Sequence, residues 1–213
     1  MSSSVHMTHV QPIGAPEHRS RKTPDRCGIA LLASAGGIAA TIKVLSVLPP
    51  DLQAPIFLSQ HLPHDSASEL VPILQRRVQL KVSWAASGQA ALAGNVYVVP
   101  PGHALEVHAR RLEVRKLPRA WQNWFNSADA LLQSMAATYG AGAIAVTLSG
   151  MMATGLIGLR AIRKEGGLAI AQSEESCSFF PMPQAAIDFG MADMVFPPER
   201  IAEALMLLAE TVG

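Results

Sequence analysis

The chain has 213 residues, of which 49% are hydrophobic and only 15% carry a charge. This composition allows a sizeable buried core and excludes an intrinsically disordered protein. Seventeen Lys and Arg residues face sixteen Asp and Glu residues, so the net charge is +1 and no basic surplus is available to bind nucleic acid. No apolar run is long enough to span a membrane, and the N-terminus lacks the apolar core of a secretory signal. We therefore expect a cytoplasmic protein with no membrane insertion.

Residues 1–26 differ from the rest of the chain. They are rich in Ser, Pro and His and show neither a helical nor a strand period. We expect this segment to be a disordered N-terminal lead-in with solvated histidines. Residues 27–213 are then expected to form one domain. Its two cysteines, Cys27 and Cys177, have no metal-ligand spacing and are expected to be free thiols.

From Cys27 onward, short apolar runs alternate with segments of helical period. The predicted strands are 29–33, 56–58, 96–99, 105–108, 112–115, 144–148, 168–171 and 194–196. Six helices are predicted. The first begins at Ile38, the second covers Ser66–Arg77, and the third is capped by Asn126 or Ser127. The fourth contains Leu156–Ile162, and the last two begin at Pro183 and at Pro198. Asp129 is expected to interact favourably with the N-terminal dipole of the helix capped by Asn126 or Ser127.

Strands that are apolar throughout, separated by helices, indicate an α/β fold with a doubly wound, mostly parallel sheet flanked by helices. The turn at residues 108–111 predicts an antiparallel β-hairpin added to that sheet. In such folds the functional sites form where strands end and helices begin. The segments of interest are therefore 33–37, 60–66, 149–154 and 171–182.

The first of these segments contains a candidate nucleophile. Ser34 follows an apolar strand at a sharp turn, and the amides after it, at Ala35 and Gly36, could hold an oxyanion. The alternative is that Ser34 is a simple N-cap of the following helix. His61 ends the next strand at the same sheet edge, where it could act as general base or merely bond to the loop.

Two other functional interpretations of these segments, a metal site and a cysteine nucleophile, are disfavoured. His61 and His64 lack a nearby carboxylate or cysteine, so we expect no metal site. Cys177 would need a lowered thiol pKa to act as a nucleophile, whereas the neighbouring Glu174 and Glu175 should raise it.

Taken together, the motifs resemble the catalytic domain of the chemotaxis protein-glutamate methylesterases, the CheB type. The turn at Ser34 is similar to the family's Ile-Gly-Ala-Ser-Thr-Gly-Gly signature, and residues 60–63 are similar to its Gln-His-Met-Pro. Further matches in the same order cover nearly all of the predicted domain: Pro101-Gly102 with Leu105, Ser127 with Asp129, Leu148 with Gly150-Met151, Ala171-Gln172 with Glu174, and Met182-Pro183 with Ala185-Ala186. The family's receiver domain is not expected within the 26 polar residues that precede the match.

The resemblance implies hydrolysis of methyl esters on chemoreceptor glutamates, and deamidation of glutamines, without a cofactor. By position, Ser34 is the implied nucleophile, His61 the base, and the backbone amide of Met151 an oxyanion donor. A methylated receptor segment is the implied partner, with other chemotaxis proteins as further partners. The position of the family's triad aspartate is occupied by Thr154, which cannot carry the charge that stabilises an imidazolium.

Other departures from the family pattern gather around the same residues. Leu32 and Met152 stand where the family has glycine, and Ala35 where it has threonine; Pro181 also replaces a common glycine. We expect Leu32 to place a bulky side chain at the tight turn. Glu174 or Asp129 could replace the missing acid in space. Two functions remain open: a methylesterase with weakened activity, or a catalytically degenerate relative that binds proteins in chemotaxis-like signalling.

Overall fold

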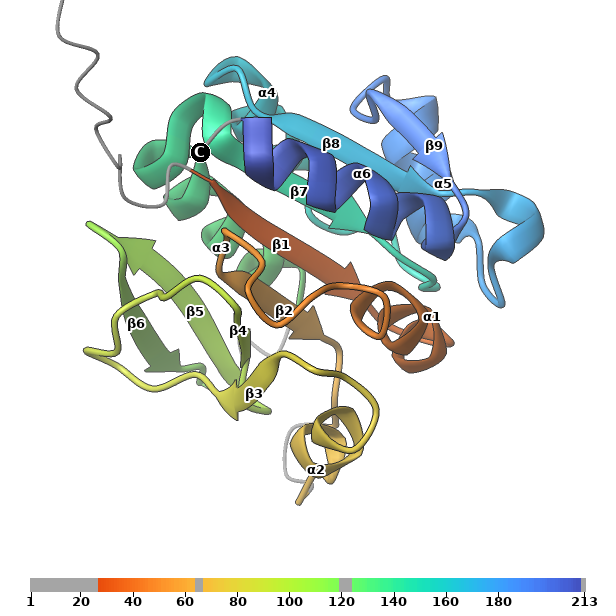
Figure 1. Cartoon of the computed structure of the whole chain (residues 1–213). Helices are drawn as coiled ribbons and strands as arrows, with labels where there is room; N and C mark the ends of the chain where they lie inside the picture. The colour runs from red at the N-terminus through yellow and green to blue at the C-terminus, as the bar shows by residue number, and fades with distance from the viewer. Residues whose placement is uncertain (1–26, 64–66, 119–123, 212–213) are drawn as a thin grey trace, which may run out of the picture.

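The computed structural model describes residues 27–63, 67–118 and 124–211. Its centre is a seven-stranded sheet in which every pair of neighbouring strands is parallel, in the order β3-β4-β2-β1-β7-β8-β9 (Figure 1). The strands are β1 (Gly28–Ala33), β2 (Ile56–Gln60), β3 (Lys81–Trp84), β4 (Asn95–Val98), β7 (Ala143–Thr147), β8 (Leu168–Gln172) and β9 (Met194–Phe196). The predicted doubly wound fold is confirmed. The lead-in expected at residues 1–26 lies outside the described residues and stays a prediction.

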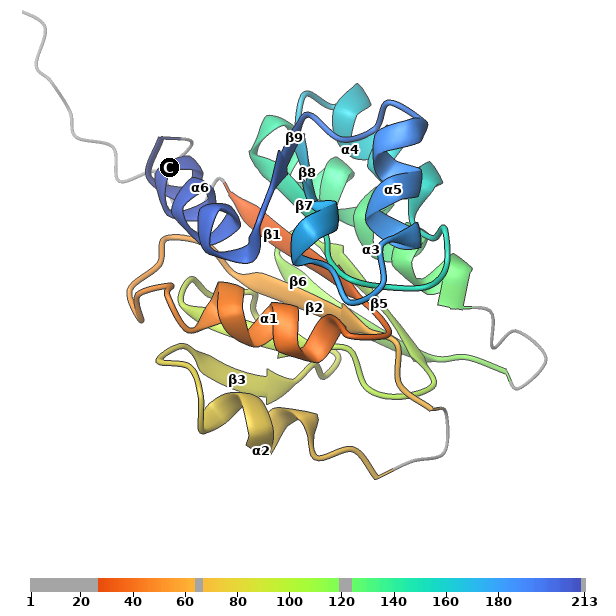
Figure 2. The same cartoon turned by 90° about the vertical axis from the view of Figure 1, so that its right-hand side faces the viewer.

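Helices cover both faces of the sheet, as Figure 2 shows with the sheet between them. One face carries α1 (Gly37–Leu45), α2 (Leu70–Gln75) and α6 (Pro198–Thr211), and the other carries α3 (Trp124–Tyr139), α4 (Leu156–Lys164) and α5 (Pro181–Asp188). Two short 3₁₀ turns, η2 (Gly140–Gly142) and η3 (Glu174–Ser176), precede β7 and follow β8. Alternate residues of β1 feed the two cores: Ile29 and Leu31 pack against α1 and α6, whereas Ala30 and Leu32 pack towards α3.

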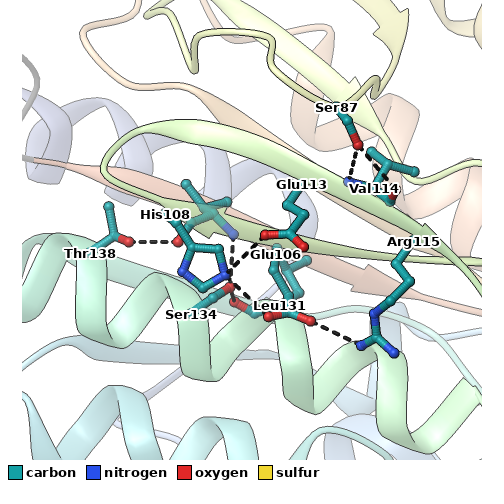
Figure 3. Close-up of polar contacts among 10 residues, drawn as sticks. Ser87, Glu106, His108, Glu113, Val114, Arg115, Leu131, Ser134 and Thr138 are labelled. Carbon is teal, nitrogen blue, oxygen red and sulfur yellow. Dashed lines mark hydrogen bonds and ion pairs between the residues drawn. The ribbon is translucent and has the colours of Figure 1, made fainter.

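The predicted antiparallel hairpin consists of β5 (His103–His108) and β6 (Arg111–Lys116). Helix α3 covers the outer edge of β5 (Figure 3): Ser134 Oγ accepts a hydrogen bond from Val107 N at 3.0 Å, and Thr138 Oγ1 donates to Val107 O at 2.7 Å. On the exposed side, Glu106 lies 3.1 Å from Arg115 and 3.2 Å from His108. Side chains of α3 therefore replace the missing neighbour strand and fix the hairpin to the domain.

Several boundaries differ from the sequence-based predictions. Strand β3 was not predicted; it is a four-residue edge strand whose first residue, Lys81, is exposed. Helix α2 begins at Leu70, not Ser66, so that Pro72 falls in its first turn. Helix α3 begins at Trp124, which puts the proposed caps inside the helix, and α5 begins at Pro181 rather than Pro183. In α1, Ile38 is exposed and the small Gly37, Ala40 and Thr41 take the buried face.

A membrane-spanning role finds no support in these elements: none of the described helices combines the length and apolar character needed to cross a bilayer.

Candidate active site

The candidate site lies where the sheet topology changes direction. Strand β1 is flanked by β2 on one side and by β7 on the other. After β1 the chain continues to β2 on one side, and after β7 it continues to β8 on the other side, so the two connections diverge between β1 and β7. A crevice at such a switch point is the usual ligand site of an open α/β sheet. Ser34 follows β1, His61 follows β2, and Ser149 to Met152 follow β7. Three of the four segments selected from the sequence therefore meet at one edge.

The turn at Ser34 is held by backbone hydrogen bonds. Ser34 N donates to Ser149 O at 3.0 Å, and Gly37 N donates to Ser34 O at 2.9 Å. Gly36 adopts φ 72° and ψ −8°, and a Cβ there would lie 2.7 Å from Ser149 Oγ and from Ser178 Cβ. Gly36 is also the N-cap of α1, without a side-chain cap. The alternative role of Ser34 as N-cap is therefore wrong.

Ser34 and His61 approach each other at the mouth of this crevice. Ser34 Oγ lies 3.5 Å from His61 Nδ1, and His61 N donates to Ala33 O at 2.8 Å. The separation is at the outer limit of a hydrogen bond, which is common in catalytic pairs without substrate. Ser34 is only 8% exposed. The geometry satisfies the expectation that the two side chains lie within reach.

A pocket surrounds this pair. Its described lining is Ser34, Ala35, His61, Leu62, Pro63, Met151 and Met152. It contains no charged carboxylate or ammonium group among those residues. Met151 and Met152 are both exposed, so that the wall of the pocket beside Ser34 is apolar and accessible.

Two backbone amides at the pocket are available as oxyanion donors. Across the described ranges, neither Ala35 N nor Met151 N donates to a protein acceptor, and both residues line the pocket. Gly36, the third residue expected here, supports the turn and does not line the pocket. An unengaged N–H beside a nucleophile is the type of group that stabilises a tetrahedral oxyanion.

Thr154 is not among the described residues that line the pocket. Its side chain is 2% exposed, and Thr154 Oγ1 donates to Met182 Sδ at 3.5 Å. Leu32 is completely buried in the core. Its Cδ1 lies so close to Gly155 that a Cβ added to this glycine would be only 2.8 Å away. The expectation that Leu32 would place a bulky side chain at the tight turn is therefore wrong, because its position in β1 directs the side chain into the core towards α3. Leu32 instead packs beneath the segment that carries Thr154.

The two carboxylates considered as replacements are also placed elsewhere. Asp129 Oδ1 accepts a hydrogen bond from Gly158 N at 2.7 Å, so Asp129 caps α4 and does not serve the dipole of its own helix. Burial raises the pKa of the Asp129 carboxyl, although the amides of Gly158 and Ile157 oppose this change. Glu174 is exposed in η3 and does not line the pocket within the described residues.

The cysteines are poor nucleophiles. Burial raises the pKa of the Cys177 thiol to about 11, and the charges of Glu175 and Glu174 act in the same direction. Burial raises the pKa of Cys27 to about 12. Both residues are therefore thiols near neutral pH, in agreement with the exclusion of Cys177 made from the sequence.

Three buried polar residues to which the sequence analysis gave no role, Gln60, Ser149 and Gln172, connect the turns of the site by hydrogen bonds. Ser149 Oγ donates to Ala35 O at 2.8 Å and accepts from Phe179 N at 3.0 Å, and Gln172 Oε1 accepts from Ser149 N at 2.9 Å. Gln60 Nε2 donates to Ser34 O at 2.9 Å and to His61 O at 3.2 Å. Gln60 and Gln172 each end an apolar strand, and this pattern is the sequence signal that could have identified them.

Comparison with known proteins gives a consistent match. Residues 29–205 match the model of the family described as CheB methylesterase. The chain is 37% identical over 189 residues to a protein-glutamate methylesterase/protein-glutamine glutaminase of Moorella thermoacetica, covering 87% of this chain and 45% of the relative. It is 32% identical over 193 residues to the Pyrococcus horikoshii protein of the same name, covering 89% and 52%. The chain thus spans about half the length of these curated relatives.

Among solved structures, the chain is similar to the Thermotoga maritima CheB methylesterase catalytic domain. The TM-score is 0.77 at 29% sequence identity, and the match covers 85% of this chain and 98% of that one.

Proposed function

The chain belongs to the CheB methylesterase family, and on that premise we propose that it is a serine hydrolase that removes methyl esters from glutamate side chains of a receptor segment. Deamidation of glutamine is the parallel reaction on an amide. The observation that carries the proposal is the approach of Ser34 Oγ to His61 Nδ1, 3.5 Å apart, beside unengaged amides at the switch point.

The proposed reaction begins with attack of Ser34 Oγ on the ester carbonyl carbon while His61 takes the serine proton. The amides of Met151 and Ala35 hold the negative oxygen of the tetrahedral intermediate. Collapse breaks the bond to the methoxy group, which leaves as methanol with the proton from His61. Water then attacks the acyl-enzyme in the same way and releases glutamate and free Ser34. The apolar wall of Met151 and Met152 suits a neutral ester better than the charged product.

Activity is proposed to be weak, because position 154 supplies no carboxylate. In serine proteases, loss of the acid costs about 10⁴ in turnover, or about 5 kcal/mol of transition-state stabilisation. The serine, the histidine and the oxyanion donors that remain still accelerate hydrolysis by roughly 10³ over water. Thr154 is neutral and bonded to Met182, which supports a slow esterase.

A serine-directed fluorophosphonate probe tests the proposal. We expect labelling of the wild type, none of Ser34→Ala, and strongly reduced labelling of His61→Ala. Ser46→Ala, which changes an exposed serine at the end of α1, is the matched control and should label normally. Release of methanol from a methylated receptor segment then tests the substrate. An unlabelled wild type would refute the hydrolase.

The second candidate function is a non-catalytic module that binds the receptor segment through the same pocket. The burial of Thr154 favours it, because the hydroxyl at the family's acid position donates its hydrogen bond to Met182 Sδ. The two candidate functions are distinguished by measuring the binding of a methylated receptor segment together with labelling by the fluorophosphonate probe. Binding of a methylated segment by a wild-type protein that is not labelled would support the module.

A further inference from the structure

We propose that Gln60 is a positioning residue that sets the distance between Ser34 and His61. The inference rests on the proposed function, since it concerns the same pair of side chains. Gln60 Nε2 donates to Ser34 O at 2.9 Å and to His61 O at 3.2 Å, so that one amide group joins the main chains of both residues. Gln60 itself touches neither the serine hydroxyl nor the imidazole in any described contact, and acts through the backbone.

The need for such a link follows from the topology. Ser34 and His61 are 27 residues apart in sequence and lie at the ends of two different strands, beyond the last rungs of the β1–β2 ladder. One main-chain bond, from His61 N to Ala33 O at 2.8 Å, continues the ladder past those ends. The amide of Gln60 adds two bonds at the same place. These two bonds connect the main chain at Ser34 and the main chain at His61 to the same side-chain amide group of Gln60.

The tolerance for movement is small. Ser34 Oγ and His61 Nδ1 are already 3.5 Å apart, at the limit of a hydrogen bond. A displacement of about 1 Å in a catalytic constellation can reduce turnover by about 10². Loosening either peptide by that amount would separate the pair.

The orientation of Gln60 also costs folding free energy. Gln60 is 7% exposed, and its Oε1 is buried with no hydrogen-bond partner among the described residues. A buried acceptor without a donor is unfavourable. A methionine of similar length would fill the same space without this cost, while Ser34 O would keep its bond from Gly37 N. If the residue served only to fill space, an apolar side chain would therefore be favoured. Glutamine differs from such a side chain in the two hydrogen bonds that it donates to Ser34 O and His61 O.

The test compares Gln60→Met with a matched control, Gln75→Met. Gln75 Nε2 donates to Val82 O at 2.9 Å, so the control removes the same kind of bond in the α2–β3 region, away from the pocket. On an activated ester, we expect Gln60→Met to lower kcat by about 10-fold to 100-fold with little change in KM. Its thermal midpoint should be unchanged or higher, because the orphaned oxygen is removed. Gln75→Met should retain wild-type kcat.

A second variant, Gln60→Glu, gives a pH signature. Burial and the two facing carbonyl oxygens should raise the pKa of the new carboxyl. When protonated, its O–H can donate to one carbonyl; when ionised, it donates to neither. The ratio of Gln60→Glu to wild-type kcat should therefore rise as pH falls through this pKa, whereas the ratio for Gln60→Met should stay flat.

The inference is overturned if Gln60→Met keeps kcat within about twofold, or if its activity falls only in step with its thermal midpoint. Failure of the proposed function is a different result, namely a wild type that the fluorophosphonate does not label. In that case crystal structures still decide: Gln60→Met should move Ser34 Oγ and His61 Nδ1 beyond about 3.5 Å, and Gln75→Met should not. An unchanged separation in Gln60→Met would exclude a positioning role.

Discussion

Thr154→Asp is the substitution that bears most directly on catalysis, because it restores the residue type of the family's triad acid. Thr154 is 2% exposed and its hydroxyl contacts Met182 Sδ, with Leu32 packed beneath the adjoining Gly155. An ionised carboxylate placed there loses its hydration and meets mainly apolar atoms. The effective cost of burying an unpaired ion is several kcal/mol, a large fraction of the roughly 5–15 kcal/mol that stabilises a typical domain.

Two opposing effects follow for the variant. The carboxyl pKa should lie above that of an ordinary Asp, so the folded state binds the proton more tightly than the unfolded state. The stability of Thr154→Asp relative to wild type should therefore fall as pH rises through the raised pKa. Hydrolysis should increase wherever the ionised group reaches His61, with a ceiling of about 10⁴ set by triad acids elsewhere. We expect a gain well below this ceiling, because desolvation opposes the charged form.

The assay combines steady-state hydrolysis of an activated ester with thermal unfolding between about pH 5 and pH 9, a range that covers the expected carboxyl titration. Thr154→Asn controls for shape without charge, and Ser34→Ala in the Thr154→Asp background should abolish the gain. A Thr154→Asp protein with wild-type stability and a 10⁴-fold gain, about the full triad contribution, would refute the burial argument. A folded variant that is no faster would show that the missing acid does not limit this site, and would favour the binding module.

Three further outcomes are expected. Gly36→Ala should destabilise the domain by about 1–3 kcal/mol in urea unfolding and reduce probe labelling, because φ is 72° and the new Cβ would lie 2.7 Å from Ser149 Oγ; an unchanged unfolding midpoint would contradict this. Burial raises the pKa of Asp129, so wild-type stability relative to Asp129→Asn should decrease as pH rises from the ordinary Asp value through the raised one; thermal midpoints that run parallel with pH would disprove it. Cys177→Ala should label like wild type, since the pKa of Cys177 is about 11; lost labelling would give that thiol a role.

Much of the fold could be predicted because its signals are local. The apolar runs that became β1, β2, β7 and β8 are buried on both faces, so they show no alternation that could be misread. Boundaries were less accurate where a helix start depends on tertiary packing, as at Leu70 and Trp124. Strand β3 was missed because an edge strand of four residues has too little hydrophobic pattern to stand out from a loop.

The site could be predicted to a similar extent. The ends of neighbouring parallel strands meet at one edge, so the order of the elements along the chain predicts that Ser34 and His61 lie close together. It could not show the direction of Leu32, because the side-chain period of a strand is two and the face that a residue joins depends on the helices that cover each side. Nor could it show the contact of Thr154, which lies in the loop before α4.

The sequence thus determined the class of sheet, the edge that carries the site and the residue types gathered there, since these depend on chain order and local hydrophobicity. The tertiary structure alone decided that Thr154 contacts Met182, that Asp129 caps α4 through Gly158, and that Gln60 joins Ser34 to His61. Each of these contacts joins two segments distant in sequence or on different elements. Their partners are selected by packing and register, which no local pattern encodes.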